Sequence, residues 1–406
     1  MALTFPIYLD HNATTPMDPR VLEAMLPYFT EKFGNASSRN HRYGWEAEAG
    51  VDTARQQIAD LIGATPKEIV FTSGSTESNN LAIKGAAEMY ASKGKHIITA
   101  LHEHKAVLDP FKRLQKEGYD VTWLEPGADG LITAEHVRSA IRDDTTLVSI
   151  MWANNELGTI NEIPEIGAVC HEKGVLLHTD ATQWVGKMPT NVVTDNIDLL
   201  SATGHKVYGP KGAGFLYVRR RRPRVRLHPL IDGGGHERGM RSGTLNVPGI
   251  VGLGAACEIA GQVMDDEQQR LLKLRKKLED GVTAGVAEAV VNGHPDKRLP
   301  GTTNISFPYV EGESLMMAVK EIAVSSGSAC TSASLEPSYV LKALGAGDEL
   351  AHSSIRFGLG RFTTEEEIDY TIDKVVTNVL KLLAMSPLYE MVKEGIDLST
   401  VEWGAH

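Results

Sequence analysis

The feature that most constrains the fold is an alternation of short β-rich runs with helix-length segments through the first half of the chain. The β-rich runs lie at residues 68–72, 96–100, 121–124, 147–152, 175–179, 199–202 and 214–218. Helix-length segments lie between most of them, for example at 75–92, 105–116 and 164–173. Repeated strand-helix units predict a mostly parallel sheet that is covered by helices on both faces.

The second half of the chain has a different pattern. Residues 249–290 are largely helical, with an apolar stripe formed by Leu271, Leu274, Leu278 and Val282. A further helix is expected near Thr364, where a Thr-Thr-Glu-Glu run offers a capping box. A chain of 406 residues is too long for one small core. We therefore expect a large α/β domain at 15–260 and a small α+β domain made of 1–14 and 261–406.

Charge argues against one class of partner. The formal net charge of −11 argues against nucleic acid, because phosphate binding depends on Lys and Arg. The local exception is a six-arginine cluster from Arg219 to Arg226, which could dock acidic partners or be a solvated strand end.

No targeting signal is expected from this sequence. No apolar run approaches the length that crosses a bilayer, and the N-terminus has neither a signal-peptide nor a transit-peptide pattern. The three cysteines are far apart, without metal-ligand spacing, which fits a reducing compartment. A bacterial-type cytoplasm is the expected location, with a processed organellar form as the alternative.

Two strand ends carry residues that suit an aromatic carbonyl cofactor. Lys206 closes the run SATGHK after an apolar strand, and it could form a Schiff base if its surroundings lower its pKa. Asp180 ends another apolar strand, at the edge where open α/β sheets bind ligands, and could hold a pyridine nitrogen protonated. Taken singly, Lys206 could be a surface lysine and Asp180 a helix N-cap.

Other strand ends suggest a phosphate and a ring contact. Gly74, Ser75 and Thr76 join a strand to a helix whose N-terminus would suit a phosphate, although many such turns share these residues. His104 could stack on a cofactor and move protons, or be an ordinary loop histidine. Gln183 could reach a ring hydroxyl or simply belong to a polar loop.

The three cysteines differ in their surroundings. Cys170 and Cys257 lie in helical patterns and are typical packing residues. Cys330 lies in the run SSGSACTSAS, whose small residues without apolar anchors are typical of mobile functional loops. An exposed thiol there would oxidise easily, so we predict that the protein uses it. Further on, Arg356 on a strand-like run could hold a substrate carboxylate or form a surface ion pair.

Together these segments resemble the cysteine desulfurases, within the fold-type I, class V aminotransferase-like pyridoxal-phosphate enzymes. The resemblance covers nearly the whole chain and includes the runs YLDHNATTP, TSGSTES, NNE, DATQ, GHK, GHERGMRSGT and SSGSACT. The long cysteine loop, about residues 325–337, resembles that of the group that supplies iron-sulfur cluster assembly. The implied fold is a large domain with a mostly parallel, mixed seven-stranded sheet plus a small α+β C-terminal domain that carries the mobile cysteine loop.

The resemblance also implies roles for the cofactor residues. Lys206 matches the lysine that carries pyridoxal 5'-phosphate, and Asp180 matches the partner of its pyridine nitrogen. His104 matches the ring-stacking histidine and Gln183 the residue beside the ring oxygen. The phosphate contacts are matched by Gly74, Ser75, Thr76, Thr203, His205 and, from the other subunit, Thr244.

Substrate residues and partners follow from the same resemblance. Asn155 and Arg356 match the contacts to the substrate carboxylate, Asn155 also lying beside the cofactor. Cys330 matches the cysteine that takes sulfur from L-cysteine as alanine is released, with His104 moving protons. The implied partners are a second copy in a homodimer, an iron-sulfur scaffold, other sulfur acceptors and acidic accessory proteins at the arginine cluster. Neither nucleic acid, nor membrane, nor a resident metal is expected, although Cys330 could transiently ligate a cluster with the scaffold.

Several alternatives stay open. A selenocysteine lyase could use the same residues, whereas an aminotransferase would not need Cys330 in such a loop. A catalytically idle scaffold would not need to retain Lys206, Asp180 and Cys330 together. A metal site built from His102 and His104 lacks a supporting ligand pair.

Overall fold

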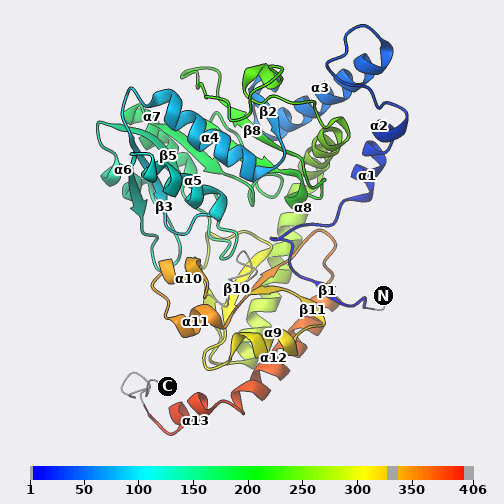
Figure 1. Cartoon of the computed structure of the whole chain (residues 1–406). Helices are drawn as coiled ribbons and strands as arrows, with labels where there is room; N and C mark the ends of the chain where they lie inside the picture. Colours follow the sequence, from blue (N-terminus) through cyan, green and yellow to red (C-terminus); the bar gives the residue numbers. More distant parts are fainter. Residues whose placement is uncertain (1–2, 327–336, 397–406) are drawn as a thin grey trace.

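The protein is organised around two β-sheets joined by one long helix (Figure 1). The computed structural model describes residues 3–326 and 337–396. We call the seven-stranded sheet and the helices packed on it the large-sheet region. The four-stranded sheet and its helices form the small-sheet region.

The seven predicted β-rich runs all form strands of the larger sheet. In chain order they are β2 (Ile69–Thr72), β3 (His96–Ala100), β4 (Asp120–Leu124), β5 (Thr145–Ser149), β6 (Leu176–Asp180), β7 (Leu199–Thr203) and β8 (Gly214–Val218). Their order across the sheet is β2-β8-β7-β6-β5-β3-β4, and only the two pairs made by β8 are antiparallel. The predicted mostly parallel, mixed sheet of seven strands is confirmed.

Helices cover both faces of this sheet, as the alternating pattern predicts. The helices before and between the strands are α1 (Pro19–Met25), α2 (Pro27–Thr30), α3 (Arg42–Ile62), α4 (Ser75–Tyr90), α5 (Lys105–Lys116), α6 (Ala134–Ala140) and α7 (Ile163–Lys173), with a 3₁₀ turn η1 (Pro66–Glu68). Successive strand residues point to opposite faces: Leu177 and Leu200 join a core with α3, whereas Leu176 and Leu199 join a core with α4 and α5. Both faces are therefore buried, which explains the continuous apolar strands.

The small-sheet region is built from the N-terminal segment and the last third of the chain. Its sheet runs β12 (Ser325–Ser326), β13 (Ser354–Gly358), β10 (Thr302–Ser306), β9 (Val290–Asn292), with every pair antiparallel. A separate parallel pair joins β1 (Ile7–Tyr8) to β11 (Ile322–Ala323). The helices are α9 (Gly312–Ala318), α10 (Tyr339–Ala343), α11 (Asp348–His352), α12 (Glu365–Leu383) and α13 (Pro387–Lys393). The expected capping box at the start of α12 is present, but it is formed by Thr364 and Glu367, one residue beyond the Thr-Thr-Glu-Glu run.

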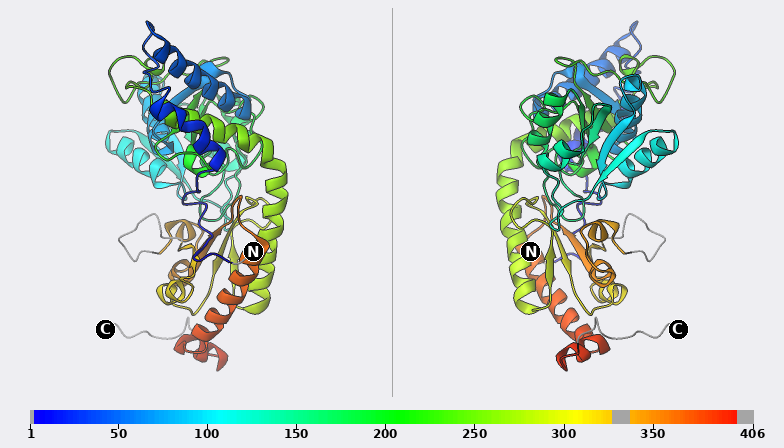
Figure 2. Two further views of the ribbon diagram at one scale, coloured as in Figure 1. Left: turned by 90° about the vertical axis from the view of Figure 1, so that its right-hand side faces the viewer. Right: turned by 90° about the vertical axis from the view of Figure 1, so that its left-hand side faces the viewer.

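Helix α8 (Val247–Gly285) passes continuously from one region to the other (Figure 2). Its first turns place Ile250 and Leu253 in the core under the large sheet, and its last turns place Leu274 and Leu278 in the core of the small-sheet region. The expected boundary at residue 260 thus falls inside one helix, and the division into domains at that point stays a prediction.

The same helix corrects one expectation. Among the described residues, α8 is long and apolar enough by length and composition to cross a membrane, although no run of that kind was expected. However, 61% of its apolar window is buried inside the protein, as in the core helix of a soluble protein.

Candidate active site

A cavity of about 670 Å³ lies where the large-sheet strands end and the small-sheet region begins. It brings together most of the predicted site residues, namely Gly74, Ser75, Thr76, His104, Asn155, Asp180, Gln183, Thr203, His205, Lys206 and Arg356. Thr244 is exposed and does not line this cavity. Cys330 and most of the expected cysteine loop lie outside the described residues.

Lys206 reaches the cavity from a 3₁₀ turn, η2 (Gly204–Lys206), that follows β7 directly. Its amine donates hydrogen bonds to the backbone oxygens of Asn12 and, at 2.7 Å, of Ala13. The N-terminal segment therefore crosses the large-sheet strand ends and fixes the direction of this lysine.

Asp180 is the last residue of β6 and is held from two sides. Asn79 Nδ2 on α4 donates to Asp180 Oδ2 at 2.7 Å, and the Thr182 N–H donates to Oδ1 at 3.0 Å. Turns rather than a helix follow Asp180, so the alternative of a helix N-cap is wrong. The carboxylate is pre-oriented at the strand end.

The turn before α4 is open towards the cavity. Gly74 has a φ of 149° and caps the helix without a side-chain hydrogen bond, so N–H groups at this helix start have no capping side chain. A Cβ on Gly214 would lie 2.6 Å from Gly74 Cα, so only glycine lets β8 pass this closely. Ser75 Oγ accepts from Thr182 Oγ1 at 2.5 Å. This arrangement can bind an anion.

Both site histidines are uncharged at neutral pH. The Ala106 N–H donates to His104 Nδ1 at 3.1 Å, which leaves the ring proton on Nε2, and burial lowers the pKa of His104. Burial, followed by repulsion from Lys206, lowers the pKa of His205 to about 4. A neutral His104 can lie on a flat cofactor without bringing a positive charge there.

Arg356 and Asn155 also line the cavity. Arg356 Nη2 donates to Asp10 Oδ1 at 2.8 Å and Nη1 to the Asn155 backbone oxygen at 3.1 Å. Arg356 is only 4% exposed, so a surface ion pair is wrong. Within the described part of the chain, Arg356 Nε and Asn155 Oδ1 have no hydrogen-bond partner. Unpaired buried polar atoms are costly, so these two atoms are suited to a polar ligand.

Three site residues were not identified from the sequence. Asp10 and Asn12 belong to the run YLDHNATTP, whose spacing to the other motifs could have suggested contact. Asn79 lies one helical turn beyond Thr76, but no sequence signal pairs it with Asp180.

The alternative metal site has no ligand cluster to support it. Among residues 3–326 and 337–396, no group of three or more His, Cys, Asp or Glu side chains could hold a metal ion. His102 is buried, and its Nε2 donates to the Gly130 oxygen at 3.0 Å.

Comparison with known proteins agrees with this site. The family model described as aminotransferase class-V matches residues 7–371. "Cysteine desulfurase IscS" of Anaeromyxobacter sp. (strain Fw109-5) is 60% identical over 401 residues, 99% of each chain. The protein of that name from Aeromonas hydrophila is 60% identical over 406 residues, 100% of each chain.

Two solved structures are similar over most of their length. A NifS-like protein has a TM-score of 0.86 at 38% identity and covers 93% of this chain and 100% of its own. A structure described as SspA in complex with cysteine has a TM-score of 0.78 at 40% identity, covering 88% of this chain and 100% of its own. The chain therefore belongs to the class V aminotransferase family and, within it, to the IscS-type cysteine desulfurases of the fold-type I pyridoxal-phosphate enzymes.

Proposed function

We propose that this cysteine desulfurase binds pyridoxal 5'-phosphate in the cavity through Lys206, removes sulfur from L-cysteine onto Cys330 and releases L-alanine. One observation carries the proposal: Lys206, Asp180 and the turn at Gly74 line one cavity, which Arg356 also lines. A lysine, a carboxylate and a phosphate turn are the donor set that this cofactor needs.

The residues present fit the cofactor. We assign its phosphate to the open turn of Gly74, Ser75 and Thr76, with Thr203 and His205 beside it, since all five line the cavity. Asp180, fixed by Asn79, would pair with the pyridine nitrogen. His104 would stack on the ring, and Gln183 would contact the ring oxygen. When bound, the cofactor withdraws electrons from the α-carbon of the substrate.

The substrate carboxylate would be bound by Arg356 and Asn155, which line the cavity and whose Nε and Oδ1 atoms are buried without a hydrogen-bond partner. An Oδ1 atom cannot donate to a carboxylate, so the Asn155 amide would contribute its nitrogen by rotation about its last bond. The Arg356 fork supplies the charge.

The protein groups then move protons and sulfur. Lys206 Nζ takes the proton from the substrate α-carbon, and His104 holds its proton at Nε2 for exchange with the thiol. The Cys330 thiolate forms a bond to the substrate sulfur as the carbon–sulfur bond breaks. The β-carbon keeps that electron pair and takes up a proton, and the α-carbon regains the proton that Lys206 removed, which yields alanine.

The other two thiols are poorly suited to this step. Cys170 and Cys257 are fully buried, and burial raises the pKa of Cys257 to about 12 and that of Cys170 further. Only a thiolate is an effective nucleophile. This contrast supports Cys330 as the sulfur acceptor.

The test is to incubate the pure holoenzyme with L-cysteine and a reductant and to assay alanine and sulfide. Mass spectrometry should find one added sulfur on the peptide that contains Cys330. Cys330→Ser should still bind the cofactor yet form no alanine catalytically; normal turnover, or sulfur on Cys170 or Cys257, would overturn the assignment. Side-by-side rates with selenocysteine and cysteine separate this activity from the alternative lyase.

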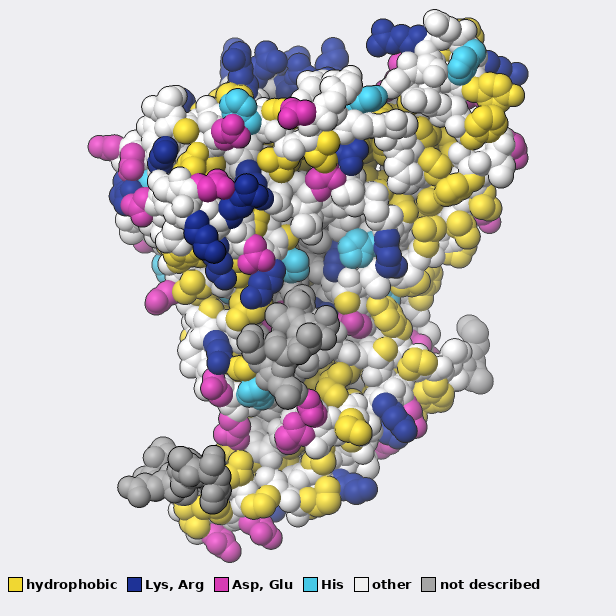
Figure 3. Space-filling view, in the orientation of Figure 1, with side chains coloured by type: hydrophobic (Ala, Val, Ile, Leu, Met, Phe, Trp, Pro, Cys, Tyr) yellow, Lys and Arg dark blue, Asp and Glu magenta, His cyan; other side chains and the backbone are white. Residues whose placement is uncertain are grey.

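We also propose that the enzyme is a homodimer in which Thr244 of one subunit contacts the phosphate held by the other. Figure 3 shows apolar side chains gathered over α1, α2 and the start of α3. The exposed apolar residues there are Leu22, Leu26, Phe29, Phe33, Tyr43 and Trp45. An exposed patch of this kind is typical of a protein interface, and an exposed Thr244 is available to a second copy.

Sulfur transfer in the cytoplasm to an iron-sulfur scaffold and other acceptors completes the proposal. It rests on the similarity to the bacterial relatives named IscS. For acidic accessory proteins we propose the arginine cluster, which the structure divides. Arg219 is bound to the buried Asp198 at 3.3 Å and Arg220 is partly buried, whereas Arg221, Arg222, Arg224 and Arg226 are exposed.

A further inference from the structure

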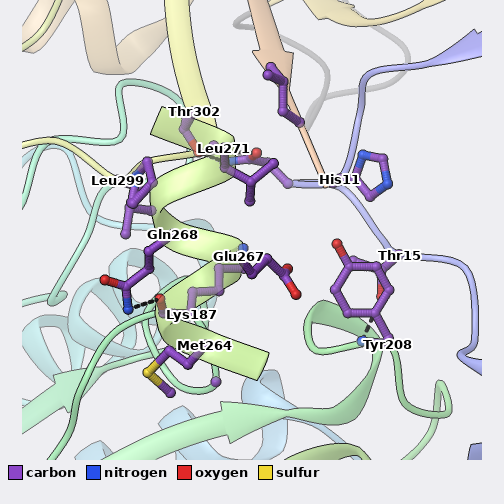
Figure 4. A pocket seen from close by; sticks show the side chains of 15 residues that line it. His11, Thr15, Lys187, Tyr208, Met264, Glu267, Gln268, Leu271, Leu299 and Thr302 are labelled. Atoms are coloured by element: carbon purple, nitrogen blue, oxygen red, sulfur yellow. Dashed lines mark hydrogen bonds between the residues drawn. The ribbon is translucent and has the colours of Figure 1, made fainter. Parts of the chain in front are cut away.

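A second, much smaller cavity lies between α8 and the N-terminal segment (Figure 4). Its volume is about 30 Å³, room for about one water molecule, so it is not a site for substrate. Most of its lining is apolar, including Met264, Leu271 and Leu299, yet the charged side chain of Lys187 enters it. A partly buried lysine in such a place needs an explanation.

The explanation begins with a continuous row of hydrogen bonds. Lys187 Nζ donates to Gln183 Oε1 at 2.8 Å, and Gln183 Nε2 donates to the Asn12 backbone oxygen at 2.9 Å. The same Asn12 oxygen accepts from Lys206 Nζ. The amine of Lys187 is therefore linked to that of Lys206 through one side-chain amide and one carbonyl.

This row fixes which end of the Gln183 amide faces the site. A protonated lysine can only donate, so it holds the Gln183 oxygen on its own side. The Gln183 nitrogen then faces Asn12, and its second N–H remains for the large cavity that Gln183 also lines. Without Lys187, only the bond to the Asn12 oxygen would hold the amide in this orientation.

We propose that Lys187 is a positioning residue that orients Gln183 so that its amide donates to the ring oxygen of the bound cofactor. This inference rests on the proposed function, since it needs the cofactor in the large cavity.

The backbone of Lys187 is itself fixed. Gln268 Nε2 on α8 donates to the Lys187 carbonyl oxygen at 2.9 Å, the dashed line beside the Gln268 and Lys187 labels in Figure 4. The long helix that joins the two regions therefore holds the residue that orients Gln183. A lysine anchored in this way loses little additional freedom when it makes its hydrogen bond.

The charges around Lys187 come from three elements. Burial is the largest cause that lowers the pKa of Lys187 to about 7, and repulsion from Lys206 is the next. Glu267 on α8 raises this pKa, whereas Arg356 on β13 lowers it further. His11 faces the same cavity and is neutral, because burial lowers its pKa to about 4, and Tyr208 stays protonated because burial raises its pKa. Protonated Lys187 can only donate to Gln183, whereas neutral Lys187 keeps an N–H but can also accept, so its hold on the amide orientation weakens as the pH rises through about 7.

The experiment compares holoenzymes by the pH titration of their visible cofactor band. Lys187→Met keeps the shape of the side chain and removes the donor. We expect the band to remain, its titration midpoint to move by about half a pH unit or more, and cofactor affinity to fall roughly twofold to tenfold, the range for one lost hydrogen bond. Lys187→Arg, which keeps a donor, should retain the wild-type midpoint. Lys276→Met, at an exposed lysine of α8, is the matched control and should change nothing.

A double-mutant cycle with Gln183→Ala decides how Lys187 acts. If it acts through Gln183, Lys187→Met should cause no further shift in the Gln183→Ala background. An equal shift in both backgrounds, or no shift in the wild-type background, would overturn the proposal. If Lys187→Met does not fold, the titrations of Lys187→Arg and Gln183→Ala replace it. An unchanged titration midpoint in Gln183→Ala would then overturn the proposal. Failure of the proposed function would look different, because the wild-type protein would then show no cofactor band.

Discussion

The two regions supply the candidate site in different ways. The large-sheet region contributes residues at the ends of its strands: Asp180 ends β6, Thr203 ends β7, and the turn at Gly74 follows β2. The small-sheet region contributes Arg356 from the middle of β13, where it is paired with Asn304 on β10 and Ser325 on β12. The large-sheet region thus contributes strand ends and the turn after β2, whereas the small-sheet region contributes a residue from the middle of a strand.

This difference separates two tasks. Under the proposed function, the cofactor is held mostly by the large-sheet region, whereas the substrate carboxylate is held by the small-sheet region together with Asn155. Changes in the first region should therefore alter cofactor binding, and changes in the second should alter substrate binding while the cofactor stays.

The largest effect is expected at Lys206. Lys206→Ala should abolish the visible cofactor band and lower kcat by about 10²–10⁴-fold or more, because the same amine is assigned both the cofactor and the α-proton. Absorbance spectra and alanine assays measure the two effects. A wild-type band in the variant would contradict the assignment.

Glu156 tests the contact between the regions. It follows β5, and its Oε2 accepts from Ser338 Oγ at 2.6 Å, at the start of α10. Burial raises the pKa of Glu156 to about 7. The folded pKa therefore lies above the unfolded value of about 4.5, so the stability from the protonated form is complete below pH ~4.5 and is lost as the pH rises through ~7.

The expected loss is about 3 kcal/mol, at about 1.36 kcal/mol for each pH unit between the two pKa values. Glu156→Gln cannot ionise, so its free energy of unfolding should lack this fall between pH ~4.5 and ~7. Urea unfolding of both proteins across this range measures the difference. Groups common to both, such as His178, whose pKa burial lowers to about 4, cancel in the comparison. Parallel curves would show that Glu156 is ionised in the native protein.

The sequence predicted the large sheet well because its strands are buried on both faces and form apolar runs between helices. The sequence-based prediction was less accurate for the ends of a strand, which depend on tertiary packing. The run was expected at 147–152, whereas β5 is Thr145–Ser149; the Ile150 and Trp152 N–H groups still donate to His178 and Asp180 of β6, and the Trp152 ring stacks on Trp184 at 4.4 Å. Propensity alone does not contain that contact.

The site residues also divide into a group that the sequence predicted and a group that it did not. Motif runs identified the groups that would touch cofactor or substrate. The groups that orient them were missed, because Asn79 and Asp180 are 101 residues apart and no spacing rule joins them. Lys187 and Gln183 are four residues apart, but turns rather than a helix bring them together.

The third prediction separates substrate from cofactor binding. Arg356→Lys keeps the charge but loses the fork, so the substrate should lose one charge-assisted hydrogen bond, about 2 kcal/mol. KM for L-cysteine should rise roughly thirtyfold while the cofactor band and its titration stay unchanged. Steady-state kinetics with spectra of the same samples measure both. A lost band would mean that the two regions do not divide the tasks.

The smallest effect is expected at the exposed arginines beyond β8, on the large-sheet region and outside the residues that line the cavity. Replacing Arg222, Arg224 and Arg226 by Glu reverses a local positive field in a chain of net charge −11. Binding of an oligo-glutamate peptide, the probe for an acidic partner, should weaken roughly tenfold at about 50 mM salt and much less at about 200 mM, since screening removes the difference.

A control variant with the same change in net charge, placed in the small-sheet region, allows peptide binding to be compared between the two regions. Lys273→Glu, Lys276→Glu and Lys381→Glu change the net charge by the same amount at exposed positions of α8 and α12. If peptide binding depends on the local arginine cluster, this control should bind as the wild type does, and both variants should form alanine at the wild-type rate. Equal weakening in the two variants would show that only net charge matters, and unchanged binding in both would make the cluster a solvated strand end. Either result would leave the large-sheet region without a docking surface at this position.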